Sequence, residues 1–110
     1  MNTAIINSDS YEKHDTGNGH PEQPKRVVAI KKRLKKRSDL IWKKPDNVPE
    51  DILAMTHSKE YIKNLKNSFP QKGLKFLDGD TVISPDSKKA VFEAAGSTIR
   101  AIDGIENKEF

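Results

Sequence analysis

The 110-residue sequence contains no cysteine and one tryptophan, and hydrophobic residues make up 34% of it. Without cysteine the chain forms no disulfide, binds no metal through a thiolate and has no cysteine nucleophile. The longest apolar runs are a few residues, as in residues 4–6, whereas a membrane-spanning helix needs about 20. The first residues also lack a basic start and an apolar core, so we expect no secretory signal. A cytoplasmic protein without a membrane segment is therefore predicted.

Basic charge is concentrated in one part of the sequence. Residues 25–44 contain ten lysines and arginines and one acid, a charge of +9, while the rest of the chain carries −5. One interpretation is a small basic module that binds an acidic partner such as nucleic acid. The other is the solvated face of a helix. The second is favoured because no aromatic residue lies within residues 25–37 to stack on bases.

The apolar pattern predicts short strands separated by helices. Residues 3–6 and 40–42 are the predicted strands, and the first is apolar at successive positions, which favours burial on both faces. A long loop is predicted over residues 9–23. Helices are predicted over residues 24–38, 50–55, 58–69 and 87–105. In the first helix, an apolar stripe is expected to face inward through Val27, Ile30 and Leu34.

The last predicted helix has a wide face of apolar and alanine residues, so we expect it to be buried between other elements. Gly96 in its interior costs about 1 kcal/mol relative to alanine unless a close neighbour needs the space. Strands alternating with helices indicate an α/β fold. Because two short strands make a poor sheet, we expect residues 1–110 to form a single incomplete domain.

The predicted loop gathers two imidazoles and two carboxylates in His14, Asp15, His20 and Glu22. Imidazole and carboxylate together suit zinc binding or acid–base chemistry, but their spacing here matches no closed zinc site. The alternative interpretation is a mobile polar loop with solvated histidines.

Two further segments carry candidate side chains. His57 precedes the predicted helix 58–69, where a packing or capping role is expected, and Ser58 is the predicted N-cap. Asp78 and Asp80 predict a turn in which one carboxylate stays free to bind a ligand.

Taken in order, these segments resemble a known family. Residues 14–27 (HDTGNGHPEQPKRV), 57–62 (HSKEYI) and 77–87 (LDGDTVISPDS) are similar to successive blocks of histone deacetylase-like amidohydrolases, including bacterial acetoin-utilisation and acetylpolyamine deacetylases. The resemblance implies an arginase-like α/β fold with a mostly parallel sheet. Residues 1–110 would be its N-terminal portion, helix-rich with two or so short strands. It also implies zinc-dependent cleavage of acetyl-amide bonds of lysine or polyamines.

The resemblance assigns positions to three residues. Arg26 matches an arginine that lines the inner channel behind the active site, Asp80 matches a position at the substrate rim, and His20 lies in a loop near the pocket mouth. No residue matches the metal ligands, the adjacent pair of catalytic histidines or the catalytic tyrosine of the family. We therefore expect no catalytic residue and no metal ligand in this chain, with zinc bound only by complete relatives.

The chain is accordingly expected to be the N-terminal third of a deacetylase domain, ending before its catalytic residues and inactive alone. Because its helices and strands would lack their covering, we expect a homo-oligomer, or association in trans with a separate C-terminal half. Two alternatives remain open. One is the basic binding module of residues 25–44, and the other is a residual binder of acetylated amines that uses His20 and Asp80.

Overall fold

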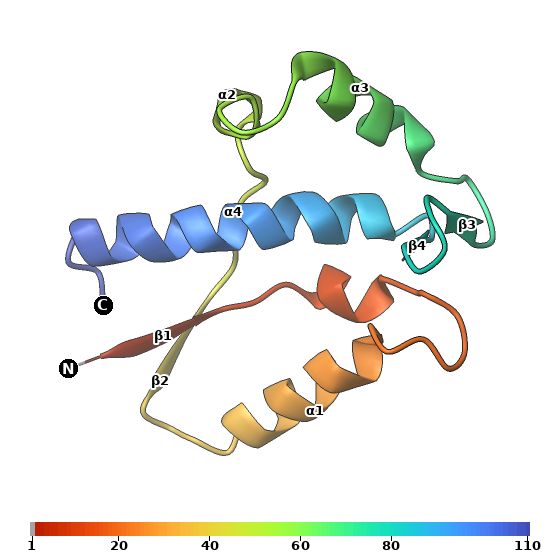
Figure 1. The fold of residues 1–110 in the computed structure, drawn as a ribbon. Helices are drawn as coiled ribbons and strands as arrows, with labels where there is room; N and C mark the ends of the chain where they lie inside the picture. Colours follow the sequence, from red (N-terminus) through yellow and green to blue (C-terminus); the bar gives the residue numbers. More distant parts are fainter. Residues whose placement is uncertain (1) are drawn as a thin grey trace.

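A computed structural model describes residues 2–110 (Figure 1). The predicted α/β class is confirmed, and the elements follow in the order β1 (Thr3–Ile6), the 3-10 helix η1 (Asp9–Lys13), α1 (Pro24–Leu34), β2 (Leu40–Lys43), α2 (Glu50–Leu53), α3 (Lys59–Ser68), β3 (Lys75–Phe76), β4 (Val82–Ile83) and α4 (Ser87–Glu106). None of the helices within residues 2–110 combines the length and apolar content that crossing a membrane requires.

β1 and β2 pair in parallel, with Thr3 opposite Leu40 and Ile6 opposite Lys43. α1 lies in the crossover between them, as a parallel pair of neighbouring strands requires. Both predicted strands are therefore confirmed. The prediction that the first strand is buried on both faces is wrong, because Thr3 is exposed and the other three residues are only half-buried. The sheet that β1 and β2 form has two strands, and α4 packs against β1.

α1 carries the basic segment on the surface, and none of its residues is buried. It begins at Pro24, a residue suited to the first turn of a helix, and it ends at Leu34, before the predicted end near residue 38. Val27 and Leu34 are half-buried, but Ile30 is 47% exposed, so the predicted inward stripe is only partly covered. The main element that α1 packs against is the short helix η1, which is too small to cover the whole stripe.

α4 crosses the middle of the molecule, with α2 and α3 on one side and β1, β2 and α1 on the other (Figure 1). It packs against η1 and β1. Ile102 and Ile105 are nevertheless 55% and 63% exposed, and the buried residues of the helix are Ser87, Ala90, Gly96 and Gly104. The prediction of a helix buried between other elements is therefore wrong for the described residues, which cover only part of its apolar face.

The segment between β2 and α2 crosses α4 directly over Gly96. A Cβ atom at this position would overlap the carbonyl oxygen of Asp46 and lie 3.0 Å from the backbone nitrogen of Val48. The amide of Val48 donates a hydrogen bond of 3.1 Å to the carbonyl oxygen of Phe92, one turn earlier in α4. A backbone neighbour therefore needs the space, which is the condition under which glycine is favoured inside a helix.

η1 lies within the region predicted to be a loop, and it joins the N-terminal segment to α4. Ser10 is buried and donates its hydroxyl proton to Glu93 Oε2 at 2.5 Å, while the Tyr11 hydroxyl donates to the carbonyl oxygen of Glu93 at 3.1 Å. Burial by itself raises the pKa of Glu93, but hydrogen bonds from Ser10 and Ser8 and the charges of nearby lysines outweigh it and lower the pKa. Glu93 is therefore an ionised anchor for the N-terminal segment.

The hydrophobic core is small, and its buried members are Leu40, Val48, Ile62, Val82, Ile83 and Ala90. The solvent-accessible surface is 8018 Å², whereas a compact monomer of 12.4 kDa has about 6,100 Å². The radius of gyration is 15.5 Å, compared with about 13 Å for a compact domain of this length. The described chain thus exposes about 1,900 Å² more surface than a compact domain of its mass.

Candidate functional site

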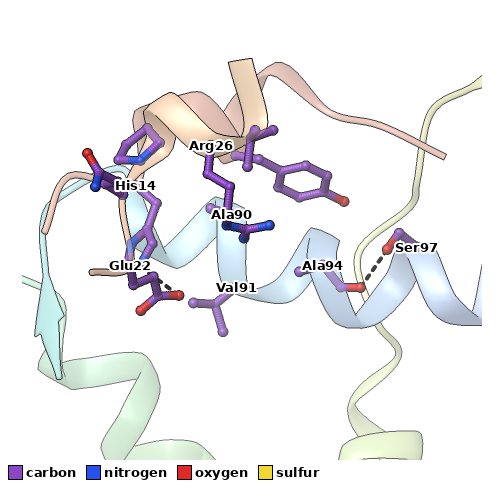
Figure 2. A pocket seen from close by; sticks show the side chains of 11 residues that line it. His14, Glu22, Arg26, Ala90, Val91, Ala94 and Ser97 are labelled. Atoms are coloured by element: carbon purple, nitrogen blue, oxygen red, sulfur yellow. Dashed lines mark hydrogen bonds and ion pairs between the residues drawn. The ribbon is translucent and has the colours of Figure 1, made fainter. Parts of the chain in front are cut away.

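A cleft of 290 Å³ lies between η1, the loop that precedes α1, the first turn of α1 and one flank of α4 (Figure 2). Its charged side chains come from the N-terminal half of the chain, and α4 contributes only small or apolar side chains, namely Ala90, Val91, Ala94 and Ser97. The space exists because α4 presents alanine here. The lining includes Tyr11, His14, Glu22, Arg26, Ala90 and Ala94.

His14 is fixed against the first turn of α4. Its Nδ1 lies 2.6 Å from the hydroxyl oxygen of Ser87, and its Nε2 lies 3.7 Å from Oε1 of Glu22. Hydroxyl, imidazole and carboxylate follow one another in the order used by serine hydrolases. Ser87 is fully buried, however, and a hydroxyl without access to a substrate is not a nucleophile. We therefore assign this chain of contacts to positioning the loop.

Ser87 is also bonded to Ser84, which directly follows β4 and precedes α4 by three residues. Its Oγ accepts the amide proton of Ser84 at 2.8 Å and lies 3.0 Å from the Ser84 hydroxyl. The Ser84 carbonyl oxygen in turn accepts the amide proton of Ser87 at 3.0 Å. This reciprocal pairing satisfies the buried Ser84 amide and the Ser87 amide, which as the first amide of α4 has no partner within the helix.

The loop that holds His14 and Glu22 is bonded at several points. The Thr16 hydroxyl donates to the carbonyl oxygen of Glu22, and the Gly17 amide donates to Oδ1 of Asp15 at 2.9 Å. Gly17 has a φ of 88°, a conformation that side-chain-bearing residues rarely adopt. The geometry therefore supports an ordered loop over the alternative of a freely mobile polar one.

The structure brings His20 and Asp80 together. His20 Nδ1 accepts the amide proton of Glu22 at 3.0 Å, and its Nε2 lies 2.6 Å from the carbonyl oxygen of Asp80. Because Nδ1 is an acceptor, the neutral ring carries its proton on Nε2, which donates to Asp80. This bond ties the loop before α1 to the connection between β3 and β4, an antiparallel pair that the sequence predicted only as a turn.

The two aspartates of that connection have different roles. Oδ1 of Asp78 accepts the amide protons of Asp80 at 3.1 Å and of Thr81 at 2.8 Å. Hydrogen bonds, of which the one from the Thr81 side chain is the strongest, hold the pKa of Asp78 below its usual value. Asp78 therefore stabilises the turn, and Asp80, which is exposed like Asp78, joins it to the loop before α1 through its carbonyl oxygen.

Arg26 reaches from the first turn of α1 toward Ala90 and Val91 of α4 (Figure 2). The residue is exposed, so its guanidinium keeps access to solvent while it lines the cleft. Arginine stays charged at all relevant pH values and matches the geometry of a carboxylate. The cleft therefore offers a permanent cation to an anionic or strongly polar ligand group.

Tyr11 also lines the cleft, a role that was not predicted from the sequence. Burial is the main cause that raises the pKa of its phenol, nearby Glu93 raises it further, and a hydrogen bond with Ser97 opposes the shift. Tyr11 thus stays a protonated donor, bonded to α4. No local pattern marks this role, because its partner lies 82 residues further along the chain.

His57 does not join the cleft. Its ring stacks on Tyr61 with centroids 5.1 Å apart, which confirms the predicted packing role. The predicted cap is also confirmed, because the Ser58 hydroxyl accepts the Tyr61 amide proton at 3.1 Å.

The donor set of the described residues does not fit the zinc that the resemblance implies. Within residues 2–110, no three histidine, aspartate or glutamate side chains lie together in a way that would hold a metal ion. Both ring nitrogens of His20 are in hydrogen bonds, and Nδ1 of His14 is bonded to Ser87. The cleft offers one imidazole edge beside one carboxylate, whereas catalytic zinc uses three protein ligands.

Comparison with known proteins adds independent information. Residues 20–110 match the sequence model of the histone deacetylase domain. An uncharacterized protein of Synechocystis sp. is 35% identical over 111 residues, which cover 94% of this chain and 35% of that protein. A protein of Archaeoglobus fulgidus named probable deacetylase is 29% identical over 115 residues, covering 99% of this chain and 31% of that protein. The chain spans about a third of the length of these curated relatives.

Proposed function

Since this chain belongs to the histone deacetylase domain family, we propose that its 110 residues form the N-terminal wall of a deacetylase pocket and do not cleave amides by themselves. In this proposal Arg26 and the alanines of α4 line the inner cavity. His20 and Asp80 support the rim. Deacetylation is the activity we propose for a protein of the relatives' full length.

The proposal is based mainly on one observation, namely that the imidazole rings of all three histidines are already engaged in contacts within the chain. Amide hydrolysis in a metal-dependent hydrolase needs a bound ion that activates water and a base that accepts its proton. His14 and His20 are engaged in hydrogen bonds, and His57 stacks on Tyr61 outside the cleft. These contacts support a positioning role for the histidines. We accordingly propose that the 110 residues bind no catalytic zinc and no other cofactor on their own.

Acetate release is the direct test of this function. We expect the purified chain, supplied with zinc, to release no acetate from acetyl-lysine or from an acetylated polyamine above the level without protein. A complete family member assayed in parallel shows that the assay works. Zinc-dependent acetate release that a chelator stops and that Arg26→Ala reduces would contradict the proposal.

We also propose that the chain associates with a second copy of itself. A standard protein–protein interface buries about 1,200–2,000 Å² in total, or about 800 Å² on each partner, so a second copy could cover part of the excess of about 1,900 Å² that the described chain exposes. The exposed isoleucines at the end of α4 are the best candidates for its centre, because large apolar patches on a monomer mark interaction sites.

Sedimentation velocity tests the association. We expect a dimer or larger species at micromolar concentration, and a monomer when Ile102 and Ile105 are both changed to lysine. The matched control changes two exposed apolar residues of the α2 region, Ile52 and Met55, to lysine and is expected to leave the association intact. A folded monomer of the unmodified chain at that concentration would rule this part of the proposal out.

A further inference from the structure

A second cleft, of 300 Å³, lies where α1 passes the segments that follow β1 and form the end of β2. Four of its lining residues are lysines and one is an acid, so its charge is +3. The remaining lining residues are an amide and the single tryptophan of the sequence. The complete lining is Asn7, Asp9, Lys31, Lys35, Trp42, Lys43 and Lys44.

Trp42 is held in a fixed position at this cleft. It is half-buried in β2, where it pairs with Ile5 of β1 in the parallel ladder. Pairing in the ladder fixes the backbone at Trp42, and the half-burial of the side chain restricts the positions open to its ring, so a ligand that stacks on it immobilises few further bonds. The indole therefore gives the cleft a rigid apolar face beside its cations.

The lysines of the cleft fall into two groups. Lys31 is bonded at 2.7 Å to both Asp9 and Glu12, so its charge is already paired and it joins α1 to η1. Lys35, Lys43 and Lys44 take part in no ion pair within residues 2–110. These three cations remain available to an anionic ligand.

The positive surface continues beyond the cleft along α1. Lys32, Arg33 and Lys36 are exposed, and the whole segment 25–44 carries a charge of +9. A single phosphate group does not require so extended a cationic surface, whereas a polymer with a charge on every unit does. An acidic polypeptide would match the charge but has no flat group that requires the indole.

We propose that this surface binds single-stranded nucleic acid, with an unpaired base stacked on Trp42 and phosphates beside Lys35, Lys43 and Lys44. The combination of a cationic groove and an aromatic platform is how proteins bind single strands without sequence preference. From the sequence, nucleic-acid binding by the basic segment was not favoured, because residues 25–37 contain no aromatic residue. The fold supplies one from β2.

The role of the lysines is tested by measuring the affinity of the full chain for a short labelled oligothymidylate. Fluorescence anisotropy gives this affinity at low and at physiological salt. We expect Lys35→Glu combined with Lys44→Glu to weaken binding on the order of tenfold or more and to reduce the slope of log K against log salt by about 1.4. The matched control, Lys63→Glu with Lys72→Glu, makes the same charge change at exposed lysines elsewhere and is expected to change affinity less than twofold. Equal loss in both double variants would overturn the proposal.

The indole is tested separately. Oligothymidylate is expected to quench the fluorescence of Trp42, and Trp42→Leu is expected to weaken binding on the order of tenfold without changing the salt slope. Trp42→Phe keeps an aromatic face and is expected to retain most of the affinity, while circular dichroism checks that both variants fold. Unchanged affinity in Trp42→Leu, or equally tight binding of polyglutamate or of a duplex of the same length, would overturn the proposal.

Discussion

Replacement of Gly96 by alanine is expected to lower the free energy of unfolding by about 3 kcal/mol. The added methyl group would overlap the carbonyl oxygen of Asp46, which is a backbone atom and cannot rotate away. The crossing segment must therefore move off α4, and the hydrogen bond from Val48 to Phe92 is lost with it. Alanine favours the helix by about 1 kcal/mol, which offsets only part of this cost.

Gly104→Ala provides the matched control in the same helix. A methyl group there would meet the ring of Phe110, which is the far end of a flexible side chain and can turn away. We expect its free energy of unfolding to change by about 1 kcal/mol or less, because the helix preference of alanine compensates. Urea unfolding followed by circular dichroism measures both variants. Equal stability of Gly96→Ala and the parent chain would show that the crossing is not tightly packed.

Ser87→Ala is expected to cost a similar amount, about 3 kcal/mol, for a different reason. The fully buried hydroxyl is the shared partner of the Ser84 amide, the Ser84 hydroxyl and the His14 ring. Its removal leaves a buried amide and an imidazole without that partner. Each buried polar group left unsatisfied costs about 1–3 kcal/mol.

Ser97→Ala is the control for this change. Its hydroxyl donates a bond of 2.7 Å to the carbonyl oxygen of Ala94 within the same helix and also interacts with the Tyr11 hydroxyl, which keeps its own bond to Glu93, so its loss is expected to cost about 1 kcal/mol. Hydrogen exchange gives a second readout, because the Asp15 amide donates to the Ser84 hydroxyl and should exchange faster in Ser87→Ala. Unchanged exchange at Asp15 together with unchanged stability would refute the positioning role of Ser87.

The elements that could be predicted from the sequence are those that depend on local patterns. The strands at residues 3–6 and 40–42 follow from apolar runs, and the start of α1 at Pro24 and of α3 behind Ser58 follow from residues suited to helix starts. In each case the residues that predict the strand or the helix start lie within that element or directly beside it.

The elements that were missed depend on distant contacts. η1 is held by Ser10 and Tyr11 through bonds to Glu93, more than 80 residues away. β3 and β4 have two residues each, too few for an alternating pattern to appear. The exposure of α4 was mispredicted because composition reports which face is apolar and not whether another element covers it.

In the candidate site, too, some features could be predicted from the sequence and others depend on contacts between distant residues. Arg26, His20 and Asp80 were singled out by resemblance, and the structure adds that Arg26 lines a cleft and that His20 is bonded to the Asp80 carbonyl. The contributions of Tyr11 and Trp42 depend on the fold, since Tyr11 is bonded to Glu93, 82 residues away, and Trp42 shares its cleft with Lys31 and Lys35 of a different segment.

The bonds from the N-terminal segment to α4 also determine when the cleft of Figure 2 can form during synthesis. Ser10, Tyr11 and His14 find their partners 83, 82 and 73 residues later in the chain. The closure of a flexible loop of that length costs about 4 kcal/mol of entropy before any contact is made. A ribosome produces β1, α1 and β2 well before α4, so the strand pair can assemble while Ser10, Tyr11 and His14 still face water. The arrival of α4 completes the cleft in a single late step.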